Sequence, residues 1–194
     1  MKIVFVSGSS RKDSQSIKVA NWLSGQLEKL EVETEIVDLY KHELPTNHED
    51  IWSDVMGKPA MSLQKILEPA DGYVVIAAEW NGMVPPSLKN FFCYVGKSMA
   101  DKPSLIAAVS STAHGGAYPI SELRMSSYKN ARILYLPEHI RIMNVNQVMN
   151  GETDHGEIET RAIYSLKVLA EYARALKSVR DSGVTDYKIY QNGM

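Results

Sequence analysis

The stretch Ser-Gly-Ser-Ser-Arg-Lys-Asp-Ser-Gln-Ser at residues 7–16 connects two segments with different hydrophobic patterns. Before it, residues 3–6 (Ile-Val-Phe-Val) form a continuous apolar run, which is typical of a strand buried on both faces of a parallel sheet. After it, apolar residues recur with the spacing of an amphipathic helix, at Val19, Ala20, Leu23, Leu27 and Leu30. The stretch is therefore predicted to be the turn from a first strand into a first helix.

The same turn carries groups that bind anions. The first N–H groups of a helix have no partner within the helix and favour negative charge. Hydroxyl and guanidinium groups, which donate to phosphate oxygens, surround this helix start at Ser9, Ser10, Arg11, Ser14 and Ser16. The turn predicts a pocket for a terminal phosphate. A serine-rich helix cap beside solvated basic side chains is the alternative that this stretch alone leaves open.

Composition narrows the class of protein. The chain has 194 residues, enough for one domain with a sizeable core, and its net charge of −2 gives no support to a role on nucleic acid or on an anionic membrane. The single cysteine, Cys93, excludes an intrachain disulfide and suits a reducing compartment. No apolar run resembles a signal peptide or is long enough to span a bilayer. We expect a soluble cytoplasmic protein.

Strands and helices are predicted to alternate along the rest of the chain. Further strands are expected at residues 32–39, 72–78, 104–109 and 131–136, the first of them nearer the sheet edge. Helices are expected around residues 61–67, 88–99, 120–128 and 157–179. This order predicts an α/β fold with a doubly wound, five-stranded parallel sheet and helices on both faces, in a single domain spanning residues 1–194.

Three segments are predicted to be less regular. Residues 40–59 form a long connection in which residues 51–56 can make a short amphipathic turn. Residues 140–148 are expected to be extended or irregular. The tail from about residue 181 has no clear period and is expected to be partly mobile.

Unusual loops follow three of the predicted strands, at residues 7–16, 79–86 and 110–116. In an open parallel sheet, ligands bind beyond the carboxyl ends of the strands, so all three loops are expected on one side of the molecule. The second loop offers Trp80 beside Asn81-Gly82, and the third ends in Gly115-Gly116, where backbone can approach a ligand closely. Each loop alone is compatible with an ordinary strand-to-helix turn. Together they suit a flat heterocycle with a phosphate tail, such as flavin mononucleotide (FMN).

Three sequence blocks make the chain resemble the NADPH-dependent FMN reductase family of flavodoxin-like proteins, which includes quinone, chromate and azo-dye reductases. The Gly-Ser-x-Arg-x-x-Ser pattern of that family resembles residues 8–14. Its Pro-Glu-Tyr-Asn-Gly block, followed by Pro and Leu-Lys-Asn, resembles residues 78–90. Its Gly-Gly loop followed by Leu-Arg resembles residues 115–124. The register extends over nearly the whole chain up to the long final helix.

The resemblance implies which residues bind the cofactor. Those implied around the phosphate and the first helical turn are Ser9, Arg11, Ser14, Gln15, Ser16 and Ile17. Those implied along the isoalloxazine and ribityl chain are Glu79, Trp80, Asn81 and Gly82, and those on the pyrimidine side are Ser110, Gly115 and Gly116. His114 lies beside the implied flavin edge, where it donates to the flavin or is simply a satisfied loop histidine.

The chain also departs from the family pattern. Trp80 stands where the family has Tyr, Ala78 where it has Pro, and Cys93 where it often has Asp at a subunit interface. The family implies a homodimer or homotetramer in which the helix after the second loop packs across subunits. The aromatic side chains within residues 88–99 are compatible with such packing between subunits or with an ordinary core.

The resemblance implies a function. Hydride passes from NADPH or NADH to FMN and then, in a ping-pong cycle, to a small acceptor: a quinone, a free flavin, an azo compound or a metal oxyanion. The flavin supplies the chemistry, so no catalytic side chain is expected, and the scattered histidines predict no metal site. Two alternatives remain at this point: a flavin-binding electron carrier or regulatory module that does not turn over NAD(P)H by itself, and an enzyme with the same fold for another phosphate ligand.

Overall fold

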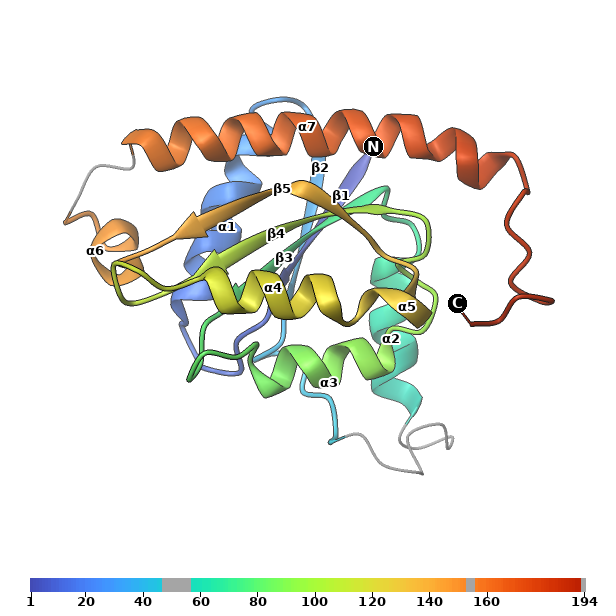
Figure 1. Ribbon diagram of the computed structural model, residues 1–194, viewed down its shortest axis with the longest axis horizontal. Coiled ribbons are helices and arrows are strands. Elements are labelled where there is room, and N and C mark those ends of the chain that lie inside the picture. The colour runs from blue at the N-terminus through green and yellow to red at the C-terminus, as the bar shows by residue number, and fades with distance from the viewer. Residues whose placement is uncertain (47–56, 153–155, 193–194) are drawn as a thin grey trace.

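The computed structural model describes residues 1–46, 57–152 and 156–192. Its five strands are β1 (Lys2–Ser7), β2 (Glu33–Asp38), β3 (Gly72–Ala78), β4 (Pro103–Val109) and β5 (Leu134–Ile142). All pair in parallel, in the order β2-β1-β3-β4-β5 (Figure 1). The predicted doubly wound five-stranded sheet is confirmed, with residues 32–39 contributing an edge strand.

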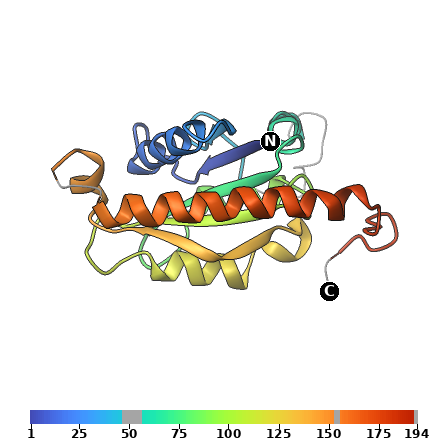
Figure 2. The ribbon, with the colours of Figure 1, turned by 90° about the horizontal axis from the view of Figure 1, so that it is seen from above.

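Helices cover both faces of the sheet, as predicted (Figures 1 and 2). They are α1 (Gln15–Glu28), α2 (Gly57–Leu67), α3 (Pro86–Tyr94), α4 (Ala117–Met125), α5 (Tyr128–Ala131), α6 (Val145–Met149) and α7 (Gly156–Asp181). Helices α1 and α7 pack on one face, where Leu23 and Leu166 are fully buried. Helices α2, α3 and α4 pack on the other, around Leu63 and Leu88. Because β1, β3 and β4 are buried on both faces, they read as continuous apolar runs in the sequence.

Strand β5 differs most from its prediction. The sequence predicted a strand over residues 131–136, but Ala131 ends helix α5 and β5 continues to Ile142. Pro137 lies inside the strand. The pairing of β5 with β4 shifts register between Ser104 and Ile106, opposite this proline. A proline at a bulge of an edge strand leaves no ladder donor unpaired, so the strand passes through it.

Smaller differences lie in the loops. Helix α3 ends at Tyr94, earlier than the predicted residue 99, because Gly96 adopts a positive φ of 55° and turns the chain. Residues 140–148, predicted as extended or irregular, contain the end of β5 and all but the last residue of the short helix α6. The amphipathic turn predicted at residues 51–56 lies outside the described residues.

The tail after α7 contacts the body of the protein. The Tyr187 hydroxyl donates to the Asp101 carboxylate, and the Arg132 guanidinium lies 4.3 Å from the centroid of the Tyr187 ring. Figure 1 shows this tail at the opposite end of the sheet from α6. Among the described residues, no helix is long and apolar enough to cross a membrane.

Candidate functional site

Three loops meet beyond the carboxyl ends of β1, β3 and β4, a region that we call the carboxyl end of the sheet. They are loop 1 (residues 8–14), loop 2 (79–85) and loop 3 (110–116). A cavity of about 330 Å³ opens between them and the start of α6. It is lined by Ser9, Arg11, Lys12, Asp13, Ser14, Gln15, Ser16, Ala78, Glu79, Trp80, Val109, Ser111, Val145 and Asn146.

The start of α1 presents hydrogen-bond donors to this cavity. Ser14 is the N-cap residue, and its Oγ accepts from the N–H of Ile17 at 3.2 Å. Among the described residues, none accepts from the N–H groups of Gln15 or Ser16. These two donors, together with the positive end of the helix dipole, have the chemistry that favours an anion.

Two loop 1 side chains complete this donor set. The Ser9 Oγ accepts from the N–H of Arg11 at 3.2 Å, which leaves the hydroxyl hydrogen free to donate outward. The guanidinium carbon of Arg11 lies 4.5 Å from the centroid of the Trp80 ring. This cation–π contact joins loop 1 to loop 2, so the predicted phosphate donor and the predicted ring-packing residue are direct neighbours.

Loop 2 is a tight hairpin turn. Trp80 and Met83 exchange two backbone hydrogen bonds, each of 2.9 Å. Between them, Asn81 has φ 49° and Gly82 has φ 70°. Two successive positive φ values are the mark of a type I′ turn, which the pair Asn-Gly strongly favours. The turn thus fixes the position from which the Trp80 side chain extends.

Loop 3 folds back on itself. A Cβ atom at Gly115 would lie 1.9 Å from the Ser110 Oγ, so only glycine fits there. The N–H of Ser110 donates to the carbonyl of Ile142 at 2.9 Å, which ties the loop to β5. Gly116 is the N-cap of α4, and its N–H donates to the carboxylate of Glu79. Glu79 therefore holds loop 3 from the end of β3.

The structure brings the predicted residues to one place but does not put all of them in the cavity wall. Those that line it are Ser9, Arg11, Ser14, Gln15, Ser16, Glu79 and Trp80. Those outside the lining are Ile17, Asn81, Gly82, Ser110, Gly115 and Gly116, which lie in the same loops or in the first turn of α1. Their roles toward a flavin stay predictions.

Several lining residues were missed from the sequence. Lys12, Asp13 and Ser111 lie within loops that were singled out, and taking each loop whole would have included them. Val145 and Asn146 come from α6, which was not predicted as a helix. A helix of five residues is too short to show a hydrophobic period, so the sequence held no signal for it.

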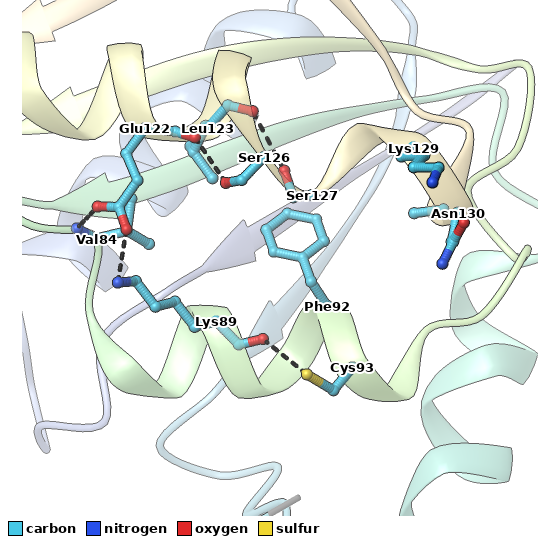
Figure 3. A pocket seen from close by; sticks show the side chains of 11 residues that line it. Val84, Lys89, Phe92, Cys93, Glu122, Leu123, Ser126, Ser127, Lys129 and Asn130 are labelled. Carbon is cyan, nitrogen blue, oxygen red and sulfur yellow. Dashed lines mark hydrogen bonds and ion pairs between the residues drawn. The ribbon is translucent and has the colours of Figure 1, made fainter. Parts of the chain in front are cut away.

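A second cavity, of about 510 Å³, lies between α3, α4 and α5 (Figure 3). Figure 3 shows Lys89 and Glu122 pointing toward one another; Nζ and Oε1 are 2.6 Å apart. The other Glu122 oxygen accepts from the N–H of Val84 at 2.7 Å. Burial raises the pKa of Glu122, but these two hydrogen bonds outweigh it and leave the pKa below its usual value. With Phe92 and Cys93 also in its wall, this cavity offers apolar surface and paired polar groups rather than anion donors.

The first cavity has the donor chemistry that a flavin phosphate needs. Backbone N–H groups, serine hydroxyls and a guanidinium converge on it, and Trp80 offers an aromatic face at its rim. Glu79 and Asp13 also line it, but the Glu79 carboxylate is engaged by Gly116. The residues present therefore fit FMN with its phosphate on the start of α1.

Comparison with known proteins agrees with this arrangement. The model of the NADPH-dependent FMN reductase family matches residues 1–146. A curated relative, the NADPH azoreductase of Bacillus sp. (strain OY1-2), is 28% identical over 186 residues, covering 93% of this chain and 97% of its own.

Solved structures with the same fold include the flavoenzyme FerB, an NAD(P)H:(acceptor) oxidoreductase from Paracoccus denitrificans. It has a TM-score of 0.68 and 20% identity, and the match covers 91% of this chain and 97% of FerB. A second is RosB with a bound 8-demethyl-8-formylriboflavin-5'-phosphate intermediate, with a TM-score of 0.74 and 13% identity, covering 92% of this chain and 81% of RosB. At these identities the likeness concerns the fold, which is flavodoxin-like as expected from the sequence.

Proposed function

This chain belongs to the NADPH-dependent FMN reductase family, and from that premise we propose that it holds FMN at the carboxyl end of the sheet and passes electrons from NAD(P)H to a small acceptor. The family makes it an oxidoreductase that uses FMN with NAD(P)H as electron donor. The observation that supports the location is the pair of N–H groups at Gln15 and Ser16, which have no acceptor in the described part of the chain and lie with Arg11 and Trp80 in the wall of one cavity.

In this proposal the phosphate binds at the start of α1. Ser9, Ser14 and Ser16 contribute hydroxyl donors, and Ser9 and Ser16 are almost fully buried, so their side chains are held in place by packing. Arg11 adds a charge-assisted donor. Removing the phosphate from the ligand is therefore expected to weaken binding far more than changing the far end of its rings.

The rings would lie across loops 2 and 3. FMN supplies the ability to accept a hydride and to return two electrons. The residues of the chain bind and orient: the type I′ turn presents Trp80, and Glu79 holds the N–H of Gly116 so that loop 3 keeps its shape. No side-chain acid or nucleophile is required. We expect NAD(P)H and the acceptor to use the same place in turn, which gives ping-pong kinetics.

The acceptor is proposed by class. The family's relatives reduce small molecules, and the curated relative is an NADPH azoreductase, so azo compounds are the first class to assay here, followed by quinones, free flavins and metal oxyanions. We also propose a cytoplasmic location, because a chain with one cysteine needs no oxidising compartment.

We further propose that the chain is a homodimer or homotetramer through the face formed by α3, α4 and α5. Met125 is 76% exposed and Tyr128 47% exposed, on either side of two serines that line the second cavity. Exposed apolar groups beside an apolar hollow favour subunit contact. Light scattering at several concentrations should give the mass of two or four chains; a single-chain mass at all of them would contradict this part of the proposal.

The main test uses purified protein titrated with FMN and, in parallel, with riboflavin. The expected result is a shifted flavin absorption spectrum and quenched flavin fluorescence, with much tighter binding of FMN, followed by oxidation of NAD(P)H with parallel initial-velocity lines when an azo compound or quinone is varied. Protein that binds no FMN contradicts the proposal. Protein that binds FMN but does not oxidise NAD(P)H without a partner protein indicates an electron carrier instead.

A further inference from the structure

Two charged side chains, one just after β3 and one in β5, hold loop 3 from the two sides of β4. Glu79, which follows β3, accepts the N–H of Gly116. Arg141, in β5, donates to the carbonyl of Gly115 from both Nε (3.2 Å) and Nη2 (2.7 Å), and Nη2 also donates to the carbonyl of His114 (3.1 Å). The loop is thus gripped by its N–H on one side and by two carbonyls on the other. The sequence patterns did not single out Arg141.

The position of Arg141 follows from the sheet. It pairs in register with Ala108 of β4, so both side chains extend from the same face. Loop 3 rests on the two of them: a Cβ atom at Gly116 would lie 3.4 Å from the Ala108 Cβ and 3.5 Å from the Arg141 Nε. The flanking residues Ile140 and Ile142 are buried in the core on the opposite face, which fixes the backbone from which Arg141 extends.

The hydrogen bonds from Arg141 determine which backbone groups of loop 3 remain available to a ligand. Arg141 occupies the carbonyls of His114 and Gly115. Among the described residues, none accepts from the N–H groups of Ala113, His114 or Gly115. With the carbonyls of His114 and Gly115 engaged and these donors without acceptors, this part of the loop is a donor surface suited to the carbonyl oxygens of a heterocycle.

Arg141 also brings charge. Its partners are neutral carbonyls, and no carboxylate of the described residues lies within ion-pairing distance of it. The guanidinium is half-buried behind the loop, where a positive charge is screened less than at the surface. A positive charge placed there favours a ligand that gains negative charge.

We propose that Arg141 is a positioning residue for the flavin: it turns the carbonyls of loop 3 away from the bound ring, leaves its N–H groups for the ring oxygens, and raises the flavin midpoint potential by its charge. This rests on the proposed function, because it requires FMN at the carboxyl end of the sheet. It adds a residue on β5 to a site whose predicted members all lie in loops 1 to 3 and the first turn of α1.

A matched control exists in the same protein. Arg124, on α4, also donates to two backbone carbonyls, those of Leu136 (3.1 Å) and Pro137 (2.6 Å). These carbonyls belong to β5, as does His139, whose Nδ1 lies 3.4 Å from Nη2, and among the described residues no hydrogen bond of Arg124 reaches loop 3. Comparing Arg141→Met with Arg124→Met therefore separates an effect on the flavin from the general loss of an arginine that supports the backbone.

The experiment measures three quantities for wild type, Arg141→Met, Arg141→Lys and Arg124→Met: the Kd for FMN, the midpoint potential of the bound flavin, and the thermal unfolding midpoint without FMN. We expect Arg141→Met to raise the Kd about tenfold, the effect of losing hydrogen bonds from a charged group, and to lower the midpoint potential. Arg141→Lys should keep most of the potential while losing affinity, since a lysine keeps the charge but not the planar fork. Arg124→Met should change only the unfolding midpoint.

The results separate two failures. If wild-type protein binds no FMN, the proposed function fails and this inference fails with it. If wild type binds FMN but Arg141→Met matches Arg124→Met in both Kd and midpoint potential, only the inference is overturned and Arg141 is structural. If Arg141→Met does not fold, Arg141→Lys decides: a potential near that of wild type with weaker FMN binding supports the role, and no change in either measurement refutes it.

Discussion

The two ends of the sheet differ in whether their polar groups find partners within the chain. At the amino end, Lys102 is almost fully buried, and its Nζ donates to the carbonyls of Leu67 (3.2 Å), Glu68 (2.7 Å) and Ser98 (2.9 Å) and to the Tyr73 hydroxyl (3.2 Å). At the carboxyl end, loops 1 and 3 leave backbone N–H groups without acceptors among the described residues.

The amino end is closed by further contacts. Asp71 accepts from the backbone N–H of Lys2 at 3.0 Å and pairs with Arg180 at 3.1 Å. The Tyr73 hydroxyl donates to the carbonyls of Leu67 and Ser98, and burial raises the pKa of this tyrosine. The charged and phenolic side chains of Lys102, Asp71 and Tyr73 are thus paired within the fold at the amino end, whereas the carboxyl end keeps backbone donors available for a ligand. Substitutions at the two ends should therefore separate stability from FMN binding.

The largest effect is expected from Lys102→Met at the amino end. The variant leaves buried carbonyls without their donor, which costs about 3 kcal/mol of the free energy of unfolding, while the Kd for FMN should stay within twofold of wild type. Urea unfolding without FMN and a flavin titration measure the two quantities. Lys97→Met is the control, because Lys97 lies at the same end but is exposed. Weaker FMN binding with unchanged stability would invert the comparison.

Gly115→Ala should have the next largest effect, at the carboxyl end. The new Cβ would meet the Ser110 Oγ at 1.9 Å and its Cβ at 2.5 Å, so loop 3 must move. We expect the Kd for FMN to rise by roughly thirtyfold, corresponding to about 2 kcal/mol of lost fit. Gly25→Ala is the control, since a Cβ there meets nothing within 4 Å and a helix gains stability from alanine. Equal FMN affinity in the two variants would show that loop 3 does not contact the ligand.

Arg11→Ala tests loop 1. Loss of a charge-assisted hydrogen bond to phosphate should raise the Kd for FMN about tenfold and leave riboflavin binding nearly unchanged. Fluorescence titration with both ligands measures this, and Arg174→Ala, an exposed arginine on α7, serves as the control. If the Kd for FMN is unchanged, the phosphate lies elsewhere; if riboflavin weakens equally, Arg11 acts through its contact with Trp80.

The central strands and the three loops could be predicted from the sequence. Continuous apolar runs indicate buried strands, and clusters of Gly, Asn and Ser indicate loops, without knowledge of distant contacts. The full length of β5 could not be predicted, because whether a strand continues through Pro137 depends on the bulge in its pairing with β4. The roles of Arg141 and Lys102 could not be predicted either. Both depend on contacts with residues more than twenty positions away, such as Gly115 for Arg141 and Glu68 for Lys102, which no spacing along the chain records.

The smallest expected effect is a pH dependence of the free energy of unfolding that comes from the amino end of the sheet alone. Burial, together with the nearby Arg180, lowers the pKa of Lys102 to about 8, against 10.5 for a free lysine. Between these values the unfolded chain binds more protons than the folded chain, so the free energy of unfolding contributed by this group rises with pH across that window. The difference in the free energy of unfolding between wild type and Lys102→Met should therefore increase between pH 7 and pH 9.5. The increase should be smaller than the loss of stability caused by the substitution itself. A difference that falls over this range would mean that the carbonyls around Nζ keep the ammonium charged in the folded protein. The positive charge of Lys102 would then stabilise the amino end instead of opposing its burial.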